Sequence, residues 1–284
     1  MKKTTIGYLF NERNLCKDEI TFLKLAKQKN INLVMINTSK VIEEEFLEKQ
    51  IKECDIFFNN SAENFSLEIA KTIEILGKKV IDSPDKFYLT EDKWLFFVKC
   101  KQQNISTPKT ILLSENINTA IRELKEMNEW PVILKRVEGT CGIYVEKADN
   151  ISQAEEIIQK FWTKGNEKLP IIAQELILSP SYRITIIGDK IVQTAIKSSK
   201  TWKATGVHAM NIKRFKVDKD LKEMIKKLLE TCGLKVCGID LLKKDDKWLF
   251  LEINSQPAFD FFEEEREGII GKVLNFLKKE AKLK

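Results

Sequence analysis

The chain has 284 residues, of which 43% are hydrophobic and 32% charged, and its formal net charge is +6. These values exclude an intrinsically disordered chain and fit a globular protein with one large domain or two smaller ones. The positive charge weakly favours anionic ligands such as nucleotides. No dense Arg/Lys block with interleaved aromatic residues occurs, so we expect no nucleic-acid partner.

The sequence predicts a cytoplasmic protein without a membrane partner. Residues 1–6 carry charge but lack the apolar core of a signal peptide, and no apolar run approaches membrane-spanning length. The six cysteines are scattered without a C-x-x-C pair, which argues against structural zinc and fits reduced thiols. Because His208 is the only histidine, we do not expect Cys–His or Ser–His–Asp catalysis.

Strand and helix patterns alternate in the first part of the chain. We predict helices at residues 18–28 and 66–76 and strands at residues 5–10, 31–36, 55–59 and 79–81. This alternation is typical of a parallel sheet with crossover helices. No G-x-G-x-x-G follows the first strand, and G-x-x-x-x-G-K-[ST] is absent throughout. The unit is therefore not expected to be a dinucleotide or P-loop site.

Ser83-Pro84 marks the expected boundary of this unit, and we place an N-terminal domain at residues 1–88. The second domain, 89–284, divides into a small lobe at about 105–176 and a C-terminal lobe at about 177–284. Its first helix contains Trp94, and further helices are predicted at 117–127, 151–162, 221–232 and 269–283. Strands are predicted at 109–113, 132–137, 143–147, 171–177, 182–187 and 190–197.

Two apolar runs, 238–242 and 248–254, read as a β-hairpin with residues 243–247 as a five-residue turn. With that turn Leu242 faces Trp248, Asp240 faces Phe250, and Glu252 lies diagonal to Asp240.

Strand residues alternate between faces, so Asp240, Glu252 and Asn254 should share one face of the hairpin. Three oxygen donors on one patch are what Mg²⁺ needs when substrate phosphates supply its other ligands. The alternative is a solvent-exposed face. Trp248 and Phe250 are expected on the same face, which argues against full exposure.

A lysine and a glycine-containing loop follow a buried strand. Lys135 ends the strand, and Glu138-Gly139-Thr140-Cys141-Gly142 leads into the next one. Glycine lets backbone N–H groups approach an anion closely, so this hairpin could fold over phosphates. A hairpin turn with convenient glycines and a solvated lysine is the alternative.

Three further positions have both a functional and an ordinary interpretation. Lys93, near a helix start, could reach a phosphate or lie on the surface. The segment 174–177, Gln-Glu-Leu-Ile, ends a strand before a proline-containing turn and could present backbone groups to an adenine ring, but as a lone motif it is uninformative. Arg183 could bind phosphate or carboxylate through its planar guanidinium, or form a cross-strand ion pair.

Taken in order, these pieces resemble the ATP-grasp superfamily, and within it the carboxylate–amine ligases of the RimK and LysX type. Each piece is weak alone, but their order and spacing are specific. The resemblance covers roughly the last two-thirds of the chain and rests on Asp92-Lys93, Pro108, 131–135, 139–142, Gln174-Glu175, Arg183, 238–240, 252–254 and Pro257. It implies an α/β protein, α+β in its catalytic part, with an ATP-grasp fold after a Rossmann-like pre-ATP-grasp domain.

The resemblance also implies roles for the matching residues. Lys93 and Lys135 would hold ATP phosphates, and Arg183 would steady the transferring phosphoryl group. Lys135 and Arg183 would thus be catalytic. The loop residues Gly139, Thr140 and Gly142 would cover the phosphates, and Gln174, Glu175 and Ile177 would line the adenine and ribose site. Asp240, Glu252 and Asn254 would hold Mg²⁺, expected as two ions, with Mn²⁺ as a substitute.

The implied reaction joins an amino-acid or peptide carboxylate to an amine through an acyl phosphate, releasing ADP and phosphate. An ATP-grasp kinase of a small acceptor and a non-catalytic nucleotide-binding module remain as alternatives. Relatives form dimers or tetramers, so a homodimer or homotetramer is expected. The segments 197–213 and 255–259 depart from the family pattern, which leaves the two substrates open.

Overall fold

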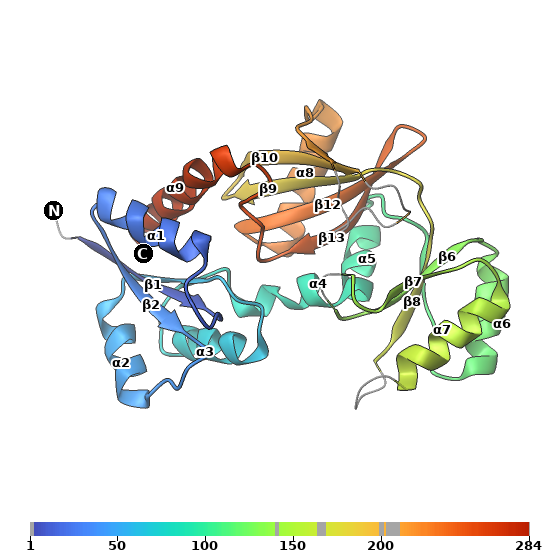
Figure 1. The fold of residues 1–284 in the computed structure, drawn as a ribbon, viewed down its shortest axis with the longest axis horizontal. Coiled ribbons are helices and arrows are strands. Elements are labelled where there is room, and N and C mark those ends of the chain that lie inside the picture. Colours follow the sequence, from blue (N-terminus) through green and yellow to red (C-terminus); the bar gives the residue numbers. More distant parts are fainter. Residues whose placement is uncertain (1–2, 140–141, 164–168, 199–201, 203–210, 284) are drawn as a thin grey trace.

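Three β-sheets follow one another along the chain in the residues that the computed structural model describes, 3–139, 142–163, 169–198, 202 and 211–283. Helices cover all three sheets, and the catalytic residues expected from the sequence lie on the second and third (Figure 1). Within the described part of the chain, no helix combines the length and apolarity needed to cross a membrane.

The first sheet is parallel, as predicted, with the order β2-β1-β3-β4. Its strands are β1 (Thr4–Phe10), β2 (Ile31–Asn37), β3 (Ile56–Asn59) and β4 (Val80–Ile81), and its crossover helices are α1 (Lys17–Gln28), α2 (Glu44–Glu53) and α3 (Asn64–Ile75). The sequence pattern did not reveal α2, a highly charged helix that buries Leu47 and Ile51. Gly7 lets β1 and β3 fit together, because a Cβ there would lie 2.3 Å from the Phe57 ring.

A helical connection leads from the first sheet to the rest of the chain. It consists of η1 (Pro84–Lys86), α4 (Tyr88–Glu91) and α5 (Lys93–Gln102). The Asp92 side chain accepts the Leu95 N–H at 2.9 Å and so caps α5. This cap fixes Lys93 at the first helical position.

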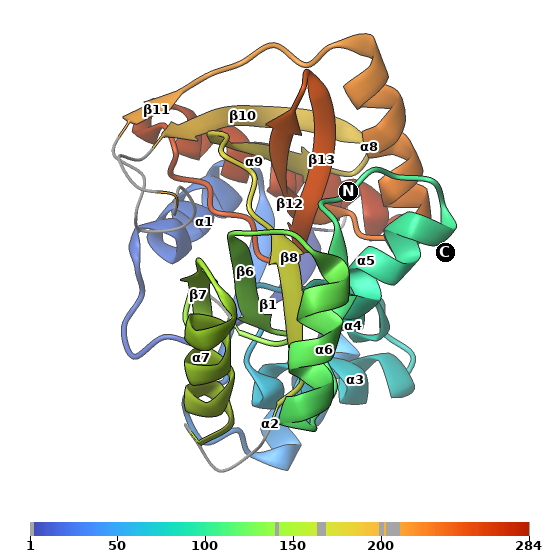
Figure 2. The same ribbon diagram turned by 90° about the vertical axis from the view of Figure 1, so that its right-hand side faces the viewer.

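The small sheet is antiparallel, with the order β5-β8-β6-β7. Its strands are β5 (Thr110–Leu112), β6 (Val132–Arg136), β7 (Val145–Ala148) and β8 (Ile171–Glu175), and α6 (Ile117–Met127) and α7 (Ile151–Thr163) cover one face (Figure 2). β7 starts later than the predicted residue 143, because Gly142 and Tyr144 have φ of 71° and 56°, which a strand does not accommodate.

The large sheet is also antiparallel, with the order β11-β10-β9-β12-β13. Its strands are β9 (Ser181–Ile187), β10 (Lys190–Ser198), β11 (Asn211–Lys213), β12 (Val236–Lys244) and β13 (Lys247–Asn254). Helix α8 (Lys219–Cys232) packs on one face through Leu221, Ile225 and Leu228. The opposite face carries Arg183, Asp240 and their neighbours.

The C-terminal helix α9 (Glu263–Glu280) lies beside α1 and buries Ile270 and Leu274 against the first sheet (Figure 1). It begins before the predicted residue 269, since three glutamates in its first turn favour the positive end of the helix dipole. A second contact joins the first unit to the large sheet. Asp82 accepts the N–H groups of Lys235 and Val236 at 2.8 Å, and burial raises its pKa to about 6.

The β12–β13 hairpin differs from its prediction at the turn. The turn has two residues, Asp245 and Asp246, with φ of 48° and 60°, as a type I′ turn requires. Lys244 therefore pairs with Lys247, and the predicted five-residue loop is wrong.

The pairing within the hairpin also differs, because the register shifts between Asp240 and Leu241. Asp240 pairs with Glu252 rather than Phe250, so Glu252 lies directly opposite and not diagonally. Trp248 and Phe250 pack in the core with Leu241, away from the acids. The prediction that they share the acidic face was therefore wrong.

Candidate active site

Two carboxylates and an amide lie together on the open face of the hairpin. Asp240 is 3% exposed and pairs across the strands with Glu252. The Asn254 amide nitrogen Nδ2 lies 3.4 Å from Asp240 Oδ2 and 3.5 Å from Glu252 Oε1. The three oxygen-bearing side chains predicted to share a face therefore do so, although the register bringing them together is different.

Two buried cations hold Asp240 in its charged form. Arg183 NH1 lies 2.5 Å from Oδ2, and Lys197 Nζ lies 3.4 Å from Oδ1. Burial by itself raises the pKa of Asp240, but Arg183 and Lys197 outweigh it and hold this pKa below its ordinary value. Burial and the neighbouring Asp240 charge raise the pKa of Glu252. Asp240 therefore stays ionised to a lower pH than an ordinary aspartate. Glu252 takes up a proton at a higher pH than an ordinary glutamate.

Gly238 leaves space for the Arg183 side chain, because it has no Cβ. A Cβ on Gly238 would lie 2.6 Å from Arg183 Nε and 2.7 Å from Cζ, closer than unbonded carbon atoms approach. Arg183 is 8% exposed, and its Nε has no hydrogen-bond partner among the described residues. The guanidinium is therefore fixed by the backbone beneath it and by Asp240 in front of it.

Lys197 and Phe261 are site residues that the sequence analysis missed. Lys197 is 4% exposed, and its Nζ lies 5.6 Å from the centre of the Phe261 ring. The Arg183 Cζ lies 6.0 Å from the same ring. Strand alternation could have revealed Lys197, because β10 pairs with β9 and Ala195 lies opposite Arg183. Phe261 follows the hairpin in an irregular segment, so strand alternation could not place it in the site.

Two lysines, Lys93 of α5 and Lys135 of the small lobe, lie near these acids. Lys135 is buried, and its Nζ donates to Gln174 Oε1 at 2.7 Å. Burial lowers the pKa of Lys135 to about 8 and also lowers that of Lys93, while the Glu252 charge acts in the opposite direction on both. The fold therefore brings Lys93, Lys135 and Glu252 into one electrostatic group, although they come from α5, β6 and β13.

The glycine loop begins beside Lys93. Lys93 Nζ donates to the Gly139 carbonyl at 2.7 Å, and the Lys93 N–H donates to the Val137 carbonyl at 3.0 Å. Gly139 and Gly142 have φ of 133° and 71°, which favours glycine at both positions. The predicted loop residue Thr140 lies outside the described residues.

Glu175 and Ile177 stand where the chain passes from the small to the large sheet. Glu175 Oε1 accepts the Lys109 N–H at 2.8 Å, and its other oxygen pairs with Lys244. A cavity of about 60 Å³ lies between the two sheets, lined by both residues together with Lys135, Gln174 and Leu242. Its volume is well below the roughly 300–1,000 Å³ of small-ligand pockets.

Comparison with known proteins shows the family of this chain. Residues 90–275 match the RimK-like ATP-grasp domain. The chain belongs to the RimK-like ATP-grasp family. A probable alpha-L-glutamate ligase of Psychromonas ingrahamii is 28% identical over 228 residues, covering 77% of this chain and 73% of that protein. The alpha-aminoadipate–LysW ligase LysX of Saccharolobus solfataricus is 28% identical over 214 residues, covering 73% and 77%.

The fold comparison agrees with this family. A RimK-domain ATP-grasp protein of Sphaerobacter thermophilus superimposes with a TM-score of 0.73 and 14% identity, covering 97% of this chain and 100% of that one. The predicted ATP-grasp fold is confirmed, and so is the predicted enzyme class. The chain is an ATP-dependent carboxylate–amine ligase.

The donor set of this ATP-grasp site fits a divalent metal ion. No group of three or more His, Cys, Asp or Glu side chains suited to a metal occurs among the described residues. Asp240, Glu252 and Asn254 therefore form an incomplete oxygen set, which phosphate oxygens would complete. Burial raises the pKa of Glu252, and the Asp240 charge raises it further through a repulsion that a cation would relieve. Asn254 presents Nδ2 to both acids, so its amide must turn before its oxygen can serve.

Proposed function

We propose that this ligase activates the carboxylate of an amino acid or peptide with ATP and joins it to an amine. The observation that carries the proposal is the facing pair Asp240 and Glu252, in which Asp240 contacts the buried cation Arg183 and Glu252 lies near Lys93 and Lys135. Such a site can neutralise the charge of a phosphoryl group in transit. The relatives' names, which mention glutamate and alpha-aminoadipate, support amino acids as substrates.

In this proposal the small lobe binds ATP together with Lys93 of α5. Lys93 and Lys135 contact the phosphates, and Gly139, Thr140 and Gly142 close over them and exclude water. Gln174, Glu175 and Ile177 bind the adenine and ribose. The narrow cavity beside these residues supports the location and requires the lobes to separate before a nucleotide enters. We also propose the domain division 1–88 and 89–284, with lobes meeting near residue 176.

The large sheet carries the chemistry. Asp240, Glu252 and Asn254 would hold Mg²⁺ or Mn²⁺, which when bound offsets the charge of the phosphates. Arg183, beside Asp240, binds the transferring phosphoryl group through its guanidinium. Lys197 stands on the other side of Asp240 and keeps that carboxylate ionised.

The reaction needs no covalent nucleophile from the protein. A carboxylate oxygen attacks the γ-phosphorus, and the bond to ADP breaks. The amine then attacks the acyl carbon, phosphate leaves with the bond electrons, and the amine nitrogen loses a proton. Water is the competing acceptor of the acyl phosphate, so loop closure protects the intermediate.

A substrate screen tests the proposed function. Purified protein with ATP and Mg²⁺ is offered pairs of carboxylates and amines, starting with glutamate and α-aminoadipate, and products are identified by mass spectrometry. We expect amide formation together with ADP release, dependent on both partners. A phosphorylated acceptor without an amide would instead indicate a kinase, and ATP binding without any turnover would indicate a non-catalytic module.

Glu252→Gln should abolish amide formation while leaving the fold intact. The substitution keeps the side-chain volume but removes the charge that a metal ion needs. We expect the rate to fall by about 100-fold or more, in line with the loss of an electrostatic group that stabilises a transition state. The control is Glu230→Gln on the exposed side of α8. Wild-type turnover in Glu252→Gln would contradict the metal assignment.

A further inference from the structure

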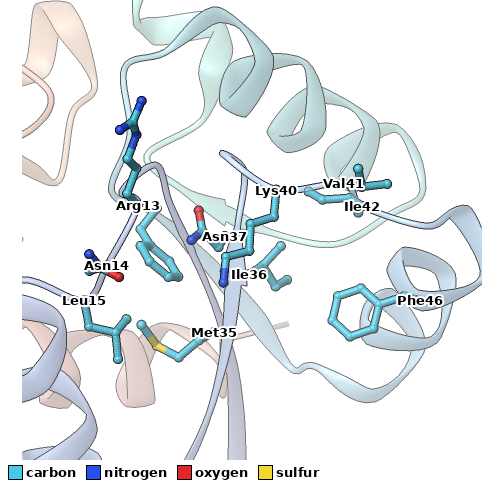
Figure 3. Close-up of a pocket in the computed structure, with 11 residues that line it drawn as sticks. Arg13, Asn14, Leu15, Met35, Ile36, Asn37, Lys40, Val41, Ile42 and Phe46 are labelled. Atoms are coloured by element: carbon cyan, nitrogen blue, oxygen red, sulfur yellow. The ribbon is translucent and has the colours of Figure 1, made fainter.

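A second and larger cavity lies in the first domain, away from the residues assigned to ATP. Its volume is about 460 Å³, within the roughly 300–1,000 Å³ of small-ligand pockets. It is formed where β1 and β2 end, between the loops that lead into α1 and α2 (Figure 3). Ligands of α/β sheets bind at the carboxyl ends of the strands, most often at the switch point of the strand order, which in this sheet lies between β1 and β3.

The two loops around this cavity are joined by hydrogen bonds. The Glu12 carbonyl accepts Asn37 Nδ2 at 2.7 Å and the Ser39 hydroxyl at 3.1 Å. The Phe10 carbonyl accepts the Thr38 N–H at 2.8 Å. These hydrogen bonds therefore hold the two loops that form one wall of the cavity in place without a ligand.

The lining is apolar with positive charge and contains no acidic residue. The charged members are Lys40 and Arg13, and neither forms an ion pair among the residues that the structure describes. In Figure 3 the Lys40 side chain extends across the cavity toward Met35, whereas the Arg13 guanidinium turns outward at the rim. The apolar members are Phe10, Leu15, Met35, Ile36, Val41, Ile42 and Phe46.

Several of these apolar side chains are exposed to solvent. Val41 is 94% exposed, and Leu15 and Phe46 are each 41% exposed. Covering them with an apolar ligand would gain roughly 25 cal/mol for each Å² removed from water.

A polyphosphate does not suit this cavity. The N-terminus of α1 is closed by its own capping box, in which the Cys16 side chain accepts the Asp18 N–H and Glu19 accepts the Cys16 N–H. Its free N–H groups are therefore fewer than an anion-binding helix end offers. The β1–α1 connection also lacks the glycines that would let backbone approach a phosphate.

We propose that this cavity binds a carboxylate attached to an apolar body, with Lys40 pairing with the carboxylate and Val41, Leu15 and Phe46 covering the apolar part. The residues that line the cavity are different from those proposed to bind ATP and metal. The same chemistry could come from a distal part of the ligase's own substrate or from an independent small molecule.

Direct binding tests the proposal without any ligase turnover. The probe is N-acetyl-L-phenylalanine, titrated against the full chain by calorimetry, with N-acetyl-L-phenylalaninamide as the uncharged analogue. We expect saturable binding of the acid, at least about threefold weaker binding of the amide, and a similar weakening in Lys40→Gln. The matched control, Lys49→Gln on α2, should bind the acid as the wild type does.

Val41→Asp provides an independent variant, because this side chain is almost fully exposed and its replacement should not disturb folding. It removes an apolar contact and introduces a negative charge next to Lys40, so it should weaken binding of the acid more than that of the amide. Absence of saturable binding to the wild type, or equal affinities in wild type, Lys40→Gln and Val41→Asp, would overturn the proposal.

Kinetics then distinguish the two sources of the ligand. If Lys40→Gln raises KM for the carboxylate substrate, the cavity holds part of that substrate. If KM stays unchanged while probe binding weakens, the ligand is independent. Both results support the assigned chemistry, and neither depends on which residues perform the ligation.

Discussion

At the residue scale, the site depends on one carboxylate held between two cations. Asp240 contacts Arg183 and Lys197, and its neighbour Glu252 has a raised pKa. Removing one partner of a buried ion pair is strongly destabilising, because it leaves an uncompensated buried charge. The arrangement therefore keeps Asp240 ionised, and a cation bound beside Glu252 would lower the raised pKa of that carboxyl.

Gly238→Ala should disturb this arrangement without altering any charge. The new Cβ would lie 2.6 Å from Arg183 Nε, so the guanidinium must move away from Asp240. We expect kcat for amide formation to fall by about 100-fold, the loss typical of misplacing a catalytic group by an ångström. Gly268→Ala on α9 is the control, because its Cβ meets no atom within 4 Å. Full activity in Gly238→Ala would show that the position of Arg183 is unimportant.

The lowered pKa of Lys135 predicts that nucleotide binding depends on pH. Its pKa is lowered to about 8, so the ammonium is charged below that pH and becomes neutral above it. Affinity for a non-hydrolysable ATP analogue should therefore fall as the pH rises above 8, by up to about tenfold per unit.

The matched variants for this measurement are Lys135→Met and Lys160→Met. Lys135→Met should bind the analogue more weakly and with a flatter pH profile, measured by calorimetry. Lys160→Met changes an exposed lysine of α7 and should retain the wild-type profile. Identical pH profiles of analogue binding in Lys135→Met and wild type would show that Lys135 does not contact the phosphates.

At the element scale, the β12–β13 hairpin positions the acids through its turn and its irregular register. Asp246 has a φ of 60°, and the second position of a type I′ turn favours glycine. The pairing of Asp240 with Glu252 follows from the register shift that comes after it.

Asp246→Gly should stabilise the protein by up to about 1 kcal/mol, because glycine avoids the roughly 1–2 kcal/mol cost of this φ and offsets only about 0.5–1 kcal/mol of that gain through its greater entropy in the unfolded chain. The lost ion pair with Lys243 matters little, because the Asp246 side chain is 97% exposed. Asp246→Ala removes the same carboxylate without easing the backbone, and it should not stabilise. Urea unfolding measures both variants, and equal stabilities would contradict the turn assignment.

Local signals predicted much of the fold. The bounds of α6 agree with the prediction because Asn116 caps one end and Asn128, with φ of 51°, closes the other. The hairpin pairing was wrong because a register shift depends on packing against neighbouring strands, which no short pattern contains. Helix α2 was missed because it buries few apolar residues.

The candidate site was predicted as separate residues rather than as an arrangement. The sequence pointed to Lys93, Lys135, Arg183, Asp240 and Glu252, and the fold brings them together from five different elements. Their assigned roles remain predictions. Phe261 was not predicted, because only the tertiary fold places its ring near Arg183 and Lys197.

At the scale of the whole molecule, α9 connects the last residues of the chain to the first sheet. Its residues Ile270 and Leu274 share one apolar core with Ile6 and Tyr8 of β1 and with Val236 of β12. The first unit and the large sheet are therefore joined by a common apolar core. This core supports the sheet that carries Asp240 and Glu252.

Leu274→Ala should weaken this common core. The side chain is fully buried, so its truncation should reduce the free energy of unfolding by about 2–5 kcal/mol. Asn275→Ala, on the exposed side of the same helix, is the control and should change little. Chemical denaturation followed by circular dichroism provides the comparison. A loss below about 0.5 kcal/mol would show that α9 contributes little to the fold.

The central claim, ligation through an acyl phosphate, is tested most directly by oxygen transfer. The carboxylate substrate found in the screen is labelled with ¹⁸O at both oxygens, and the released phosphate is examined by mass spectrometry. Because a carboxylate oxygen attacks the γ-phosphorus and leaves with it, we predict one ¹⁸O in each phosphate and one in each amide. Unlabelled phosphate accompanying amide formation would contradict the account.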